Sequence, residues 1–136
     1  MSHYAGEPVR GILHSTDASA GVAIPIFNQG SVIQRTIGSD EYLEIHSIRL
    51  VTVAGGDCYV LIGPDATLGT GETVVRGTFA ANSGLSASIL LHTGRPSWNP
   101  FLVAPVGVVD VEFTGVIRRA DHLGRAAYQA SLVPGQ

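Results

Sequence analysis

The sequence contains no lysine, and charged residues make up only 14% of its 136 residues. All eight basic residues are therefore arginine, and the formal net charge is −3. A nucleic-acid-binding surface shows clustered basic residues, whereas the only adjacent basic pair in this chain is Arg118–Arg119. We therefore expect no direct binding of nucleic acid.

The scarcity of charge also bears on how the surface is used. Soluble domains usually carry about 25% charged residues, and arginine is enriched and lysine depleted at protein interfaces. The composition therefore fits a protein that covers part of its surface with partners. The same composition also fits an uncharged polar surface of Ser, Thr, Asn and Gly, or a genome that favours arginine codons.

Cysteine occurs once, at Cys58, which excludes an intramolecular disulfide and predicts a buried thiol that packs as a small hydrophobe. The apolar runs are far shorter than the roughly 20 residues of a membrane-spanning helix. The first residues lack the charged and apolar regions of a secretory signal. These absences predict a soluble protein, made in a cytoplasm, with no membrane partner.

Motifs for catalysis or metal binding are also lacking. A zinc site needs three or four ligands at compact spacing, but His46 is the only histidine in the interior of a predicted strand, and no second ligand follows it closely. The nucleotide-binding glycine fingerprints and the nucleophile elbow are absent. We therefore predict no catalytic residue, no metal and no cofactor, and we expect that the protein is not an enzyme.

What the sequence does contain is a series of alternating apolar and polar stretches separated by turn residues, which is typical of β-strands. No window before residue 119 shows sustained helical periodicity. The pattern predicts an all-β fold, an eight-stranded antiparallel β-sandwich of the jelly-roll type. The eight candidate strands cover residues 21–27, 31–37, 41–54, 58–63, 73–80, 85–92, 101–105 and 106–119.

The last strand presents two different faces. One face carries core residues (Val109, Val111, Phe113 and Ile117, with Gly115 in register), and the other carries Val108, Asp110, Glu112, Thr114, Val116 and Arg118. The two carboxylates could be read as a catalytic pair, but the polar face of a strand explains them more simply. In the strand over 41–54 the apolar register changes near His46, which predicts a β-bulge there.

The chain divides into three parts by pattern. Residues 1–20 lack alternation and are predicted to be an extended N-terminal arm, residues 21–119 a β domain, and residues 120–136 a C-terminal tail. Isolated apolar residues in the two ends, Tyr4, Ile12, Leu13 and Tyr128, are candidate anchors for docking on a partner.

Trp98 lies in a loop between Pro96 and Pro100. A tryptophan in such a rigid loop can cap the core, anchor a protein contact, or form a platform for a sugar ring. All three interpretations fit the sequence.

Three segments, with their turns and strand alternation, carry a family resemblance. They are Gly56-Asp57, the segment "GTFAANSG" at residues 77–84, and the segment "LVAPVGVVDVEFTGVI" at residues 102–117. In these segments the chain resembles the small jelly-roll cement, or decoration, proteins of tailed bacteriophage capsids. The resemblance covers roughly residues 42–119 and is carried by turn glycines and core residues, so it transfers no functional residue.

The resemblance implies a structural protein on the outer surface of a virion. Such a protein would bridge subunits of the major capsid protein and associate with itself as a dimer or trimer. The predicted interface comprises Tyr4, Ile12, Leu13, Trp98, Asp110, Glu112, Arg118, Arg119 and Tyr128. The alternative function is a carbohydrate- or receptor-binding β-sandwich module of a phage fibre or head.

Overall fold

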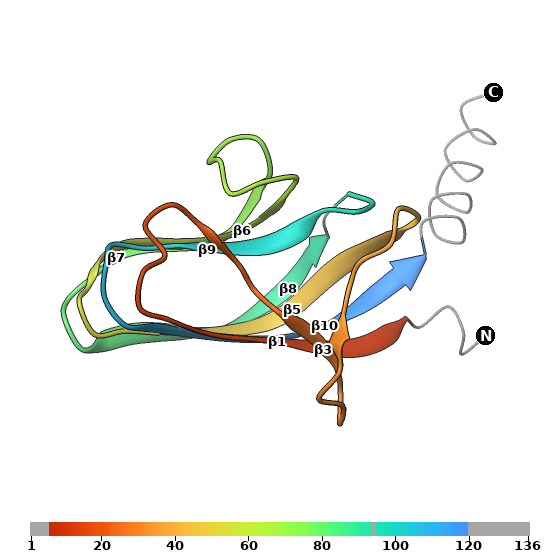
Figure 1. Ribbon diagram of the computed structural model, residues 1–136, viewed down its shortest axis with the longest axis horizontal. Coiled ribbons are helices and arrows are strands. Elements are labelled where there is room, and N and C mark those ends of the chain that lie inside the picture. The colour runs from red at the N-terminus through yellow and green to blue at the C-terminus, as the bar shows by residue number, and fades with distance from the viewer. Residues whose placement is uncertain (1–5, 94, 120–136) are drawn as a thin grey trace.

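The computed structural model describes residues 6–93 and 95–119, and every regular element in this part of the chain is a β-strand (Figure 1). The predicted all-β class is therefore confirmed. The strands are β1 (Glu7–Ser15), β2 (Val22–Ala23), β3 (Ile26–Asn28), β4 (Gln34–Arg35), β5 (Glu41–Thr52), β6 (Gly56–Gly63), β7 (Glu72–Phe79), β8 (Ser83–Thr93), β9 (Asn99–Val103) and β10 (Val109–Arg119).

The strands form two antiparallel sheets. The large sheet has six strands in the order β4-β3-β1-β10-β5-β8, and the small sheet has four in the order β2-β9-β6-β7. Figure 1 shows them as two layers, with β9 and β6 above and β1, β10 and β5 below. The arrangement is therefore sandwich-like.

One core lies between the two layers. Leu43, Ile48 and Phe113 contribute from the large sheet, and Val60 and Leu102 from the small sheet, each no more than 2% exposed. The burial along β10 alternates residue by residue from Val109 to Ile117. The two faces predicted for this strand are thus confirmed, and its polar face lies on the side of the large sheet away from the small one.

The β-bulge predicted near His46 is also confirmed. In the ladder between β5 and β10, Thr114 pairs with Ser47 and Gly115 pairs with Ile45, so His46 is the extra residue. A side chain at Gly115 would place its Cβ 2.1 Å from the backbone oxygen of Glu44. Only glycine therefore allows the two backbones to approach this closely at the bulge.

The predicted N-terminal arm is wrong for Glu7–Ser15, because these residues form β1 between β3 and β10. Its inward positions are Val9, Gly11 and Leu13, and the central one has no side chain. A Cβ at Gly11 would lie 2.1 Å from the ring of Phe113, its partner across the ladder. The phenylalanine thus fills the place of the missing apolar residue, which is why the sequence of this segment shows no alternation.

The strand count also differs from the predicted eight, since ten strands are present in the described residues. One addition is β1. The other arises because the segment 21–27 breaks at Ile24-Pro25, so that β2 joins the small sheet and β3 the large one. Proline has no backbone N–H for a ladder, and the chain changes sheets at this point. The predicted tail at 120–136 lies outside the described residues.

Candidate docking interface

The exposed side of the large sheet, here called the outer face, brings several predicted interface residues together. The ladder registers align Ile12 of β1, Glu112 of β10, Arg49 of β5 and Ser86 of β8 in one row across the strands. A shallow depression of about 290 Å³ lies on this row, and a second of about 190 Å³ adjoins it near Ser86. The first is lined by Ile12, Leu13, Arg49, Val51, Asp110, Val111 and Glu112.

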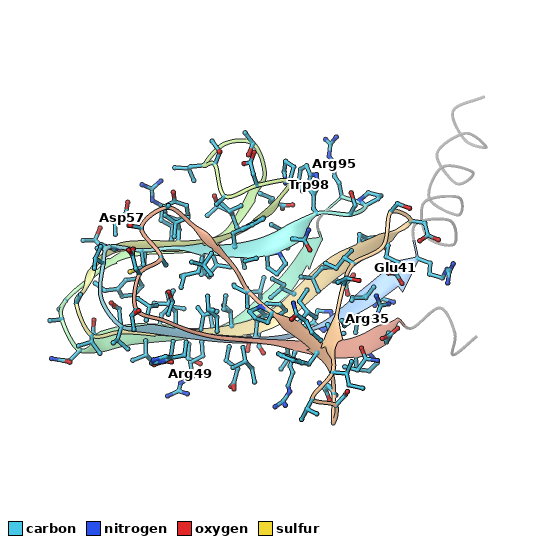
Figure 2. All side chains as sticks on the ribbon, in the orientation of Figure 1. Arg35, Glu41, Arg49, Asp57, Arg95 and Trp98 are labelled. Carbon is cyan, nitrogen blue, oxygen red and sulfur yellow. The ribbon has the colours of Figure 1, made fainter. Side chains whose placement is uncertain are left out.

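Arg49 and Glu112 stand directly opposite each other in the β5–β10 ladder, and both are exposed. Side chains at such positions are close enough to form an ion pair, yet neither has a hydrogen bond or ion pair within the described part of the chain. Figure 2 shows the guanidinium of Arg49 pointing away from the sheet. Both charges are thus available to another molecule.

Asp110, one row further along β10, has a partner in its own chain. Its Oδ1 lies 2.6 Å from Nδ1 of His14 on β1, and both side chains are more than half exposed. The pair stands in solvent, where such contacts contribute at most about 1 kcal/mol. Because its side chain is 56% exposed, Asp110 remains accessible on the outer face.

Arg118, at the other end of β10, binds Glu44 of β5. Its Nε and Nη2 donate hydrogen bonds to the two carboxylate oxygens at 3.1 and 3.2 Å, and His46 Nε2 lies 2.6 Å from Glu44 Oε1. Burial acts to raise the pKa of Glu44, but the hydrogen bonds from Arg118 and His46 outweigh it, and the pKa lies below its usual value. This cluster is a structural tie within the large sheet.

A second cluster ties the edge of the large sheet together. The guanidinium of Arg35 on β4 bonds both carboxylate oxygens of Glu41 and of Glu7, at distances from 2.7 to 3.1 Å (Figure 2). The hydrogen bonds from Arg35 lower the pKa values of both carboxyl groups. Close by, Arg119 Nη2 lies 3.0 Å from Asp40 Oδ2. The bonds of Arg35 thus tie β4, although it is only two residues long, to β1 and to the start of β5.

The turn between β3 and β4 exposes two large apolar side chains to solvent. Val32 is 89% exposed and Ile33 76%. We call these two residues the apolar tip. Figure 1 shows the β3–β4 turn projecting beyond the large sheet on the side away from the small sheet, which is the side of the outer face.

Trp98 lies at the opposite layer of the molecule. It is partly buried and packs against the core, and the Arg95 guanidinium lies 5.6 Å from the centre of its ring (Figure 2). The interpretation as a cap on the core fits this position. Because Arg95 occupies one ring face, that face is not open to stack on a sugar.

The structure brings together only part of the predicted interface. Ile12, Asp110 and Glu112 share the outer face, whereas Leu13 packs against the core. Tyr4 and Tyr128 lie outside the described residues. Arg49 was missed, although its place between Ile48 and Leu50 already indicated an outward position once the bulge at His46 was recognised.

The described residues show no further candidate for a reactive or metal-binding site. Cys58 is fully buried, and burial raises the pKa of its thiol. No group of three or more His, Cys, Asp or Glu side chains in this part of the chain is placed to hold a metal ion. The same residues include no helix with the length and hydropathy needed to cross a membrane.

Comparison with known proteins adds little. No model of a protein family matches the chain, and no curated protein matches it. Among solved structures it is similar to a chain of the Bacillus endospore appendages, which form disulfide-linked pili. The two share 15% sequence identity and a TM-score of 0.39, over 82% of this chain and 85% of that one. A likeness of this degree establishes neither a shared fold nor a shared function.

Proposed function

We propose that this chain is a non-enzymatic structural protein that attaches to the outside of a phage capsid as a cement, through the outer face and the apolar tip. The observation that carries the proposal is that two kinds of contact group lie on the same side of the molecule. Arg49 and Glu112 offer charges without partners in the described chain, and Val32 and Ile33 offer exposed apolar surface.

The charged and the apolar groups would contribute to binding in different ways. Arginine is among the residues that contribute most to binding when a partner excludes water around it. Apolar side chains at the tip gain about 25 cal/mol for each Å² that a partner covers. Repeated attachment to neighbouring coat subunits would convert such modest single contacts into lasting avidity.

The proposed architecture is a jelly roll, and the strand order supports it. Without β3 and β4, the chain has two four-stranded sheets in the orders β1-β10-β5-β8 and β2-β9-β6-β7. The first and last of these eight strands are neighbours in one sheet, and the chain passes repeatedly between the sheets. Two interleaved Greek keys of this kind define the jelly roll of many capsid proteins. The pair β3–β4 is then an insertion that carries the apolar tip.

The test is attachment to capsids that were assembled without this protein. Purified wild type and the variants Arg49→Glu and Val32→Asp/Ile33→Asp are incubated with such capsids, and the bound fraction is measured by co-sedimentation. We expect each variant to bind about tenfold more weakly or worse, which corresponds to a loss of roughly 1.4 kcal/mol. Circular dichroism verifies that the variants are folded.

Arg76→Glu is the matched control, because it makes the same charge change on the exposed side of the small sheet, where Arg76 pairs with Asp57. Its attachment should remain close to that of wild type. Equal binding by all variants would overturn the assignment of the outer face. Binding to a glycan array that disappears in Trp98→Ala would support the carbohydrate-binding alternative instead.

A further inference from the structure

The two sheets have four edges, and three of them carry features that discourage pairing with another chain. Natural edge strands are protected by shortness, charge, proline or bulges. β2 and β4 are only two residues long each, and β7 carries Glu72 and Arg76 together with a register shift in its ladder with β6. None of these edges offers a long, regular row of free backbone groups.

The fourth edge, β8, is different. It spans eleven residues with no proline and no Asp, Glu, Lys or Arg, and β5 is its only sheet partner in the described chain. Between the pairs Ser47–Ser88 and Ile45–His92, β8 has three residues where β5 has one, so the ladder is irregular there. The segment Ser83–Ser88 before this irregularity pairs residue by residue with β5 and forms the regular, unprotected part of the edge.

We propose that the Ser83–Ser88 edge of β8 pairs antiparallel with the same edge of a second copy of this chain. Pairing about a two-fold axis closes after two copies, because each strand offers its partner the same surface. The two large sheets would become one continuous sheet. This inference concerns the free protein and does not rest on the proposed attachment to capsids.

The side chains of this segment favour a second copy as the occupant. Leu85 and Ala87 pack against the core, and Gly84, Ser86 and Ser88 are exposed. Since none of them is charged, two copies meet without the repulsion that opposed like charges cause. Small neutral side chains also provide no specificity pockets, so binding must come from backbone hydrogen bonds, which an identical strand supplies as well as any other.

The experiment measures the mass of the protein in solution by sedimentation equilibrium over a wide range of concentration. We expect wild type to approach twice the chain mass of 14.2 kDa. Ser86→Lys/Ser88→Lys places four like charges at the joined edges and should raise the dissociation constant about tenfold or more. The matched control Gln34→Lys/Thr36→Lys adds the same charges at the opposite edge of the large sheet and should associate like wild type.

Hydrogen exchange of the wild-type protein provides a test that needs no variant. Amides within residues 83–88 should exchange more slowly at high protein concentration than at low concentration. The proposal is overturned if wild type stays monomeric at every concentration, if the β8 variant associates as wild type does, or if protection of this edge is independent of concentration. Strong protection at every concentration would mean that a segment of the same chain covers the edge.

Discussion

At the scale of single residues, Glu44 shows how a buried charge is held in a sheet. It lies on the outer face of the large sheet but is only 6% exposed, beneath Arg118 and His46. Burying a carboxylate is costly unless opposite charge and hydrogen bonds compensate, and here both Arg118 bonds do so. The pair therefore contributes to stability only while the carboxylate is ionised.

The sign of the pH dependence follows from the lowered pKa of Glu44. Because this pKa is lower in the folded chain than its ordinary value of 4.5, the unfolded chain binds the proton more readily. The stabilisation is fully present above about pH 4.5 and is lost as the pH falls through the folded value. Urea unfolding at pH 7, 5 and 3 should therefore show a smaller acid loss in Glu44→Gln than in wild type.

Arg118→Met provides the companion variant. It leaves Glu44 buried without its main partner, so we expect it to lower the free energy of unfolding at pH 7 by roughly 1.5–3 kcal/mol, the usual range for a hydrogen bond to a charged group. The double variant Glu44→Gln/Arg118→Met should lose less than the sum of the two single variants. An identical acid response in wild type and Glu44→Gln would contradict the lowered pKa.

At the scale of strands, the sequence predicted those strands in which apolar and polar side chains alternate clearly along the chain. The two faces of β10 and the bulge in β5 follow directly from the positions of Val, Ile, Leu and Phe residues. β1 was not predicted because Gly11 removes the middle of its apolar pattern, and Phe113 supplies that volume from the neighbouring strand. Such compensation between strands depends on register, which a single sequence does not display.

The candidate interface was predictable to a similar extent. The polar face of β10 could be derived from alternation, whereas the ion pairs of Arg118 with Glu44 and of Arg119 with Asp40 join residues far apart in the chain. The neighbours of a strand decide which of its charges are already paired. Sequence therefore identifies an exposed face but not which of its groups remain available to a partner.

The assignment of β1 as an inner strand predicts resistance to proteolysis. Arg10 lies in the middle of β1, with ladders to β10 and β3 on its two sides. Trypsin should therefore cleave the folded protein after Arg10 as slowly as after Arg49 in β5, since both bonds require local unfolding. Mass spectrometry of timed digests measures the two rates. Rapid cleavage after Arg10 in an otherwise intact protein would instead indicate a mobile arm.

At the scale of the whole molecule, the described residues combine a sandwich-like core with two sides of different character. On the small-sheet side, Arg76 pairs with Asp57 and lies over the ring of Tyr59, and Arg95 lies over Trp98. On the large-sheet side, the outer face leaves Arg49 and Glu112 without a partner in this part of the chain, and the apolar tip projects. These groups on the large-sheet side are the ones that the proposed attachment uses.

The most direct test of the proposed role as a cement protein is its copy number in virus particles. Particles are purified from the source of the sequence, and quantitative mass spectrometry compares this protein with the major capsid protein in them. A cement protein should be present at a copy number comparable to that of the coat. A few copies per particle, or none, would contradict the proposed function.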